Sequence, residues 1–217
     1  MRAAPASVAV HIWPQQMALA VKALGSGPGL TVVGIATPAP HDRQLARQLV
    51  RCALRQLLGQ FLDRPAASIA LVSQPGQGIV LNLPGTQLRL SVSHMSGLSV
   101  AAVSCRSAVG VDVMEVGGLA SDMPDWAQVA QDYLGPVQTA LLHCTSTACR
   151  PAAFARAWTR FEASLKCCRL EMTEWTPDVA DLLTSCQMMA LSLPDGCCGT
   201  VAMAGQVAGQ TINPPEN

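Results

Sequence analysis

The segment from Trp158 to Lys166 carries a carboxylate and an ammonium at a spacing that could do chemistry. Glu162 follows Trp158 by four residues, and Lys166 follows Glu162 by four, so the three side chains would share one face of an α-helix. Taken alone, the Glu162–Lys166 pair is most simply a surface ion pair that stabilises a helix by about 0.2–0.5 kcal/mol. Two other segments place polar groups in apolar sequence and favour a functional interpretation.

An aspartate interrupts the apolar segment 109–115. Valines alternate there with Gly110 and Asp112, as the two faces of a β-strand do. A carboxylate buried in such a strand without a partner costs several kcal/mol, and a metal ion or cationic ligand would relieve that cost. Gly110 lacks a side chain and could leave room for a ligand. The alternative is an aspartate at a strand end, bonded to backbone amides.

Ser93 and His94 follow residues 88–92, whose alternating leucines and valine predict a strand. A hydroxyl and an imidazole at a strand end can bind a phosphate, whereas the alternative is an exposed turn. A serine hydrolase is disfavoured, because neighbouring side chains on a strand point apart and the chain has no Gly-x-Ser-x-Gly turn.

Four arginines recur every fourth residue on the helix that Asp42 is predicted to cap. The planar fork of arginine suits phosphate and carboxylate groups, so the stripe could bind a phosphorylated ligand and an acidic partner. A solvated helix face is the alternative. The four residues are Arg43, Arg47, Arg51 and Arg55.

Together, the three polar segments resemble the 4'-phosphopantetheinyl transferase superfamily, in both its surfactin-type and its holo-acyl-carrier-protein synthase-like branches. The family pattern is Ser-His, then Gly-Val-Asp-x-Glu, then Trp-x-x-Lys-Glu-x-x-x-Lys, and the resemblance spans about residues 40–205. It implies an enzyme that moves the phosphopantetheine arm of coenzyme A onto a serine of an acyl or peptidyl carrier protein. Such enzymes serve fatty acid, polyketide or nonribosomal peptide biosynthesis.

The resemblance also implies roles for individual residues. Asp112 and Glu162 would bind the Mg²⁺ that holds the coenzyme A diphosphate. Glu162 would take the proton from the carrier serine, and Lys166 would stabilise or protonate the departing adenosine bisphosphate. The coenzyme would be contacted by Ser93, His94, Arg43 and Lys166.

The chain departs from the surfactin-type pattern directly after Asp112. That pattern has a second glutamate two residues later, where this chain has Met114 followed by Glu115. Strand alternation turns Glu115 to the opposite face from Asp112. The holo-acyl-carrier-protein synthases also have an Asp-x-x-Glu run and use two protein carboxylates. We therefore expect a two-carboxylate site completed by water, which Glu115 would join only if a β-bulge re-aimed it.

Three further positions depart from the family. Gln77 stands where a phosphate-binding lysine is usual, Phe161 replaces the lysine of Trp-x-x-Lys-Glu, and Gln138 replaces a glutamate. These losses leave open whether activity is reduced or abolished. The main alternative function is therefore a degenerate, non-catalytic member that binds coenzyme A or a carrier protein. A structural α+β domain is a third alternative.

The composition narrows the functional classes. A net charge of zero gives no overall field to attract nucleic acid. No apolar run approaches the ~20 residues of a membrane span, and the start lacks the pattern of a secretory signal. The nine cysteines include no Cys-x-x-Cys pair and are expected to be reduced core thiols without a catalytic role. We expect a cytoplasmic monomer.

Hydrophobic periodicity and turn residues predict an α+β fold. The order strand, helix, strands recurs in each half, and the resembling surfactin-type enzymes have two similar lobes with the active site between them. We therefore expect pseudo-duplicated lobes at residues 1–116 and 117–217. The expected strands span residues 7–12, 30–36, 69–72, 78–81, 88–92, 99–104, 108–116, 188–193 and 199–204. The expected helices span residues 42–61 and 151–169, with one ending near residue 129 and another following residue 136.

Overall fold

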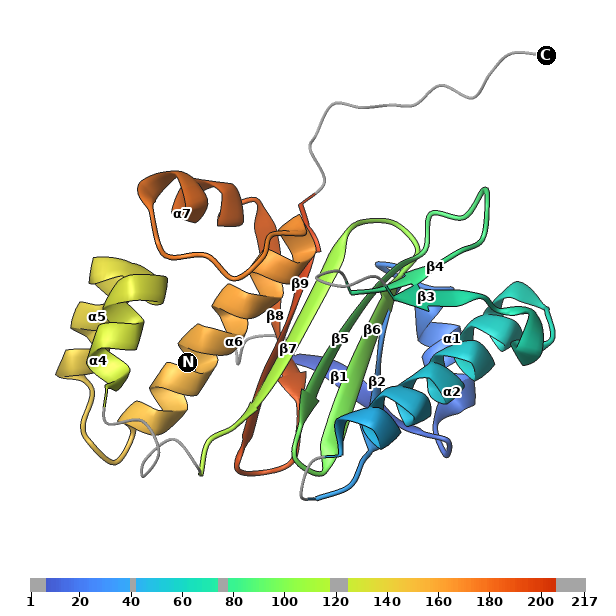
Figure 1. Cartoon of the computed structure of the whole chain (residues 1–217), viewed down its shortest axis with the longest axis horizontal. Helices are drawn as coiled ribbons and strands as arrows, with labels where there is room; N and C mark the ends of the chain where they lie inside the picture. Colours follow the sequence, from blue (N-terminus) through green and yellow to red (C-terminus); the bar gives the residue numbers. More distant parts are fainter. Residues whose placement is uncertain (1–6, 40–41, 74–77, 118–124, 206–217) are drawn as a thin grey trace, which may run out of the picture.

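The computed structural model describes residues 7–39, 42–73, 78–117 and 125–205. It has 40% helix and 30% strand, so the predicted α+β class is confirmed. Figure 1 shows a central sheet with α1 and α2 on one side and α4 to α7 on the other. The pseudo-duplication and the division at residue 116 remain predictions.

Seven strands form one sheet in the order β5-β6-β2-β1-β8-β9-β7, and β3 and β4 form a separate hairpin. Strand β1 pairs in parallel with β2 and β8, while the other pairs are antiparallel. The sheet therefore includes strands from both sides of residue 116. The strands are β1 (Ser7–Trp13), β2 (Leu30–Ala36), β3 (Leu71–Ser73), β4 (Ile79–Leu81), β5 (Arg89–Met95), β6 (Leu98–Ser104), β7 (Val109–Glu115), β8 (Cys186–Ser192) and β9 (Cys197–Ala204).

The prediction that β5 ends before Ser93 is wrong. The strand continues to Met95, and His94 pairs with Ser99 of β6. A tight turn at Ser96 and Gly97, where Gly97 has φ +78°, joins the two strands. Because glycine adopts this conformation without steric cost, the hairpin closes later than the sequence pattern suggested. Ser93 and His94 are thus strand residues.

The sheet curls around an apolar cluster on one of its faces. Val100 of β6 and Val111 of β7 belong to this cluster although their strands lie far apart in the sheet order. The two edge strands consequently meet. The hydroxyl oxygen of Ser91 accepts a hydrogen bond from the Val111 amide (3.0 Å), and that of Ser93 accepts one from the Val113 amide (3.3 Å). Side chains, rather than a backbone ladder, join β5 to β7.

Helices α1 (Met17–Leu24) and α2 (Arg43–Leu62) cover the other face of β2 and β6. Asp42 caps α2 as predicted, because its carboxylate accepts hydrogen bonds from the amides of Gln44 and Leu45. Most leucine side chains of α2 are wholly or partly buried, but Leu45 is 40% exposed because it lies in the first turn, beyond the core. Helix α1 was not predicted from the sequence.

Helix α6 (Arg150–Cys168) packs across β7 and β9. Its buried side chains include Phe154, Phe161 and Leu165, and Cys167 is buried at its end whereas Cys168 is only partly buried. Against it pack α4 (Trp126–Val129), a π-helical turn at Ala130–Leu134 and α5 (Gly135–Cys144). The seven-residue α7 (Pro177–Leu183) was not predicted, although Thr176 caps it and Pro177 opens it.

Gly110 lets α6 approach β7 closely. A Cβ atom at this position would collide with the Ala163 carbonyl and lie 2.5 Å from the Cys167 amide. The prediction that Gly110 makes room for a ligand is therefore wrong, because the backbone of α6 fills that room. The close approach is what brings the side chains of α6 to Asp112.

We expect Gly110→Ala to lower the free energy of unfolding by at least about 1–3 kcal/mol, because overpacking forces the helix away from the strand. Gly78→Ala is the matched control, since an added Cβ there would meet no atom within 4 Å. Urea unfolding of both variants measures the effect. Equal stability of the two variants would show that α6 moves at no cost.

Candidate functional site

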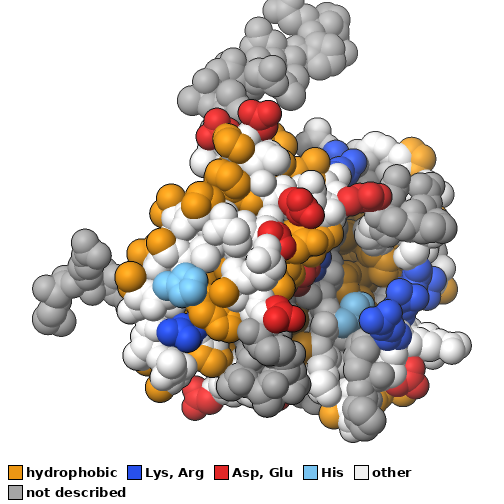
Figure 2. Space-filling model, turned by 60° about the vertical axis from the view of Figure 1, so that its left-hand side comes forward, with side chains coloured by type: hydrophobic (Ala, Val, Ile, Leu, Met, Phe, Trp, Pro, Cys, Tyr) orange, Lys and Arg blue, Asp and Glu red, His pale blue; other side chains and the backbone are white. Residues whose placement is uncertain are grey.

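A cleft of about 470 Å³ lies where α2, β5, β7 and α6 converge. Figure 2 shows a hollow with basic side chains along one rim and acidic side chains along the other. The cleft brings together all six residues that the sequence proposed for the site. Its lining residues are Arg43, Arg47, Val92, Ser93, His94, Asp112, Val113, Met114, Trp158, Glu162 and Lys166.

Asp112 lies at the base of this cleft and is 5% exposed. Its Oδ1 atom accepts hydrogen bonds from Lys166 Nζ and Ser93 Oγ, both at 2.7 Å. A buried carboxylate needs such partners, because it has lost its hydration shell. The strand-end alternative is wrong, since Asp112 lies inside β7 and its partners are side chains.

Lys166 joins the two carboxylates of the cleft. Its Nζ atom lies 2.7 Å from Asp112 Oδ1 and 3.3 Å from Glu162 Oε2. It also donates to the Val111 carbonyl at 3.3 Å. The other oxygen of Glu162 accepts from Trp158 Nε1 at 2.8 Å. The Glu162–Lys166 pair, predicted to share one helix face, is therefore part of a network of charged side chains that also includes Asp112.

Burial raises the pKa of Asp112 from 3.8 to about 6. The Lys166 ammonium acts in the opposite direction and lowers this pKa, whereas the nearby Glu162 carboxylate raises it. Desolvation is the largest of these effects, as expected for a carboxylate between a strand and a helix. The ionised form is favoured by the charge of Lys166 and by the hydrogen bonds that Lys166 and Ser93 donate to Asp112.

Ser93 lines the cleft, and its hydroxyl group is bonded to neighbouring residues of β7. The side chain is buried, donates to Asp112 and accepts from the Val113 amide. These contacts orient Asp112 and hold the edge of β7, so Ser93 acts on the site through its neighbours. His94 also lines the cleft, and its Nδ1 atom lies 2.7 Å from Ser99 Oγ, within hydrogen-bonding distance.

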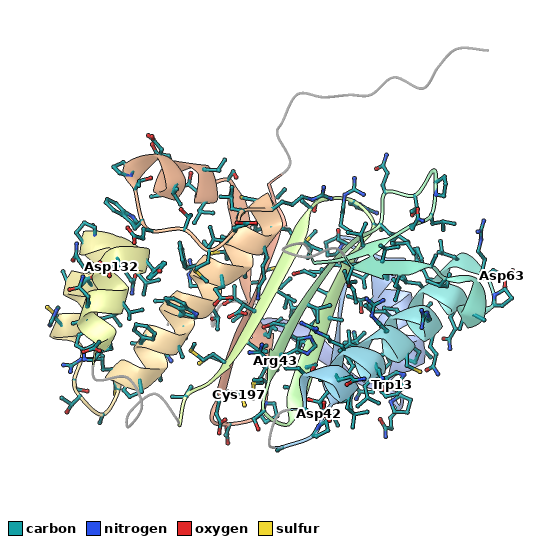
Figure 3. The ribbon with its side chains drawn as sticks, in the orientation of Figure 1. Trp13, Asp42, Arg43, Asp63, Asp132 and Cys197 are labelled. Carbon is teal, nitrogen blue, oxygen red and sulfur yellow. The ribbon has the colours of Figure 1, made fainter. Side chains whose placement is uncertain are left out.

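The arginine stripe of α2 divides into two pairs. Arg43 and Arg47 line the cleft, and Figure 3 shows Arg43 near the start of α2. Arg51 instead donates to the Leu71 carbonyl and Ser73 Oγ, and Arg55 donates to the Ile69 carbonyl. The second pair therefore anchors β3 and the residues just before it.

Glu115 lies outside the cleft lining. The pairing of β7 with β9 continues without a bulge to Glu115, which lies opposite Cys197. Strand alternation therefore leaves Glu115 exposed on the other face, and Met114 lines the cleft in its place.

Of the three further departures from the family pattern, Phe161 and Gln138 lie away from this cleft. Phe161 is 8% exposed, packs between Tyr133 and Trp158, and together with Gln138 lines a separate groove. Gln77 lies outside the described residues. The hydrogen bond from Trp158 to Glu162 was not predicted from the sequence. The four-residue spacing of the two was the available signal.

The donor set of the cleft suits a hard divalent cation. Two carboxylates converge on one cationic group, which is the ammonium of Lys166, and oxygen ligands completed by water are what Mg²⁺ prefers. Among the described residues, no cluster of three or more His, Cys, Asp and Glu side chains is placed to hold a metal. Lys166 is 32% exposed, so its flexible side chain can move away from the two carboxylates when a metal ion binds them.

Two general findings bear on function. None of the helices in the described part of the chain is long and apolar enough to span a membrane. Comparison with models of known protein families finds no match, and neither does a search of curated proteins.

The raised pKa of Asp112 predicts a pH-dependent stability in metal-free buffer. The folded state holds this proton more tightly than the unfolded state, so the contribution of Asp112 is full below about pH 4 and is lost as the pH rises through about 6. The shift corresponds to about 3 kcal/mol. We expect Asp112→Asn to gain stability relative to wild type over this range.

Urea unfolding at several pH values tests this expectation. Glu115→Gln is the control, because it removes an exposed carboxylate from the same strand. Parallel stability curves for wild type and Asp112→Asn would contradict the assignment of the titration to Asp112.

Proposed function

We propose that the protein is a 4'-phosphopantetheinyl transferase that moves the arm of coenzyme A onto a serine of an acyl or peptidyl carrier protein. The observation that most supports this proposal is that the predicted site residues lie together in the structure. Residues from four separate segments, each singled out by a family motif or by the arginine stripe, line one cleft with a buried carboxylate at its base.

The cleft is suited to a diphosphate bound through a cation. Asp112 and Glu162 would hold Mg²⁺, which neutralises charge on the diphosphate when bound. Arg43 and Arg47 add positive charge at the rim and can bind phosphate oxygens bidentately. His94 also lines the cleft. Ser93, which the resemblance gives as a coenzyme contact, is proposed to orient Asp112.

The reaction needs a proton acceptor and a stabilised leaving group. Glu162 lies at the partly exposed side of the charged network, where it can take the proton of the carrier serine directly or through water. The serine oxygen then bonds to the phosphorus that bears the pantetheine arm, and the bond from that phosphorus to the bridging oxygen breaks. Lys166 would stabilise or protonate the departing 3',5'-adenosine bisphosphate. Positioning and charge neutralisation supply most of the catalysis, as in other phosphoryl transfers.

The finer features of the proposal follow the resemblance. They are a pseudo-duplicated fold with its site between two lobes, a cytoplasmic location and a monomeric state. Coenzyme A is the substrate and Mg²⁺ the cofactor.

A second candidate is a non-catalytic relative that binds coenzyme A or a carrier protein. The contacts among the charged side chains of the cleft favour this candidate. Lys166 contacts both carboxylates, and Trp158 donates a hydrogen bond to the other oxygen of Glu162. Turnover requires this network to open, whereas a binding protein could retain it.

Intact-mass measurement of carrier proteins separates the two candidates. The protein is incubated with coenzyme A, Mg²⁺ and a panel of apo acyl and peptidyl carriers. The enzyme adds the phosphopantetheine mass to a carrier, whereas a binding protein co-elutes with the carrier or coenzyme and leaves its mass unchanged. Absence of both results across the panel would reject the proposal.

Glu162→Gln should reduce transfer by about 10²-fold or more, because the amide keeps the shape of the side chain but can neither accept the proton nor ligate a cation well. Glu171→Gln, at an exposed position beyond α6, is the matched control. The rate of carrier modification measures the effect. Near-normal turnover by Glu162→Gln would remove Glu162 from the mechanism.

Asp112→Ala should weaken Mg²⁺-dependent binding of coenzyme A more than Glu115→Ala does, because only Asp112 faces the cleft. Calorimetric titration with coenzyme A, with and without Mg²⁺, provides the comparison. Equal losses in the two variants would mean that β7 bends in solution and that three carboxylates contribute.

A further inference from the structure

A second groove of about 470 Å³ lies on the opposite face of α6 from the cleft. At 3.6 residues per turn, the groove-lining residues of α6 lie roughly half a turn away from Glu162. Figure 1 shows α5, α6 and α7 grouped on this side of the molecule. The groove is lined by Tyr133, Leu134, Gln138, Ala153, Arg156, Ala157, Arg160, Phe161, Trp175, Val179, Ala180 and Leu183.

Aromatic side chains form a wall of this groove and are held in place by packing. The Tyr133 ring lies 5.7 Å from that of Trp158 and 6.4 Å from that of Phe161, measured between centroids. Phe161 is itself buried at 8% exposure. The apolar surface is therefore already formed without a ligand, which lowers the cost of binding one.

Trp175 is fixed by two independent features. Its backbone amide donates to the Asp132 carbonyl at 2.7 Å. Its indole lies against Gly135, where a Cβ atom would collide with the ring and where φ is +79°. The loop before α7 is thereby held against the start of α5, and the indole stays beside the groove.

The charge of the groove is positive. Arg156 and Arg160 lie one helical turn apart on α6, so their side chains are neighbours, and both are exposed. Neither forms a salt bridge with a described Asp or Glu residue, because both salt bridges found there involve Lys166. The described lining contains no acidic side chain. An anion would therefore meet two guanidinium groups above an apolar floor.

We propose that this groove binds an apolar carboxylic acid, with its aliphatic or aromatic body on Phe161 and Trp175 and its carboxylate on Arg156 and Arg160. The volume lies within the range of small-molecule sites, about 300–1,000 Å³. The paired guanidinium groups match a carboxylate, and the apolar wall matches a hydrocarbon tail. The inference is independent of the transferase proposal, since the groove does not include the cleft residues.

Calorimetric titration with decanoate tests the site. Decanol has the same tail without the charge, and acetate has the charge without the tail. We expect decanoate to bind at least about tenfold more tightly than either, which corresponds to about 1.4 kcal/mol. Equal binding of decanol and decanoate would overturn the proposal, because the arginines would then contribute nothing.

Substitutions inside and outside the groove test whether decanoate binds there. The double variant Arg156→Gln/Arg160→Gln should weaken decanoate binding at least about tenfold, whereas Arg64→Gln, at an exposed position after α2, should not. Ala180→Phe fills the groove from α7 and keeps both arginines, so it should also block binding. Circular dichroism confirms that each variant is folded.

Two further results would reject the inference. Decanoate binding that survives Ala180→Phe would place the ligand elsewhere. Displacement of decanoate by coenzyme A would place it in the cleft. Carrier modification by the double variant provides a separate readout, and retained transfer together with lost decanoate binding is the expected result.

Discussion

The burial of one carboxylate governs the arrangement of the candidate site. Asp112 stands in an otherwise apolar strand, and its ionised form requires compensation. Lys166 provides a charge and Ser93 a hydrogen bond. Each partner comes from a different element, so the ionised form of the buried Asp112 is stabilised only when α6 and β5 are both docked on β7. The positions of α6 and β5 are consequently coupled to the charge of Asp112.

Structural features that depend on local sequence pattern could be predicted from the sequence. Alternating valines located β7, the four-residue spacing placed Glu162 and Lys166 together, and Asp42 marked the start of α2. The position of Glu115 outside the cleft also followed from alternation, because no bulge interrupts the ladder.

Features that depend on tertiary packing could not be predicted in the same way. A glycine in a strand is compatible with a bound ligand or with a close helix, and at Gly110 the helix is the occupant. The arginines of α2 are chemically alike, yet the position of β3 gives Arg51 a backbone carbonyl while Arg47 lines the cleft. Ser93 was recognised as important, but its partner lies 19 residues away on a strand that is not adjacent in the sheet order.

The contact between β5 and β7 also affects how the protein meets other chains. Edge strands with free backbone groups can add a strand from another molecule and so promote aggregation. Here Ser91 and Ser93 use their hydroxyls to occupy two amides of β7, and each edge shields the other. Because side chains make these contacts, β5 and β7 are joined without backbone hydrogen bonds between them. The two edges of the sheet are therefore joined along a seam of side-chain contacts in place of a backbone ladder.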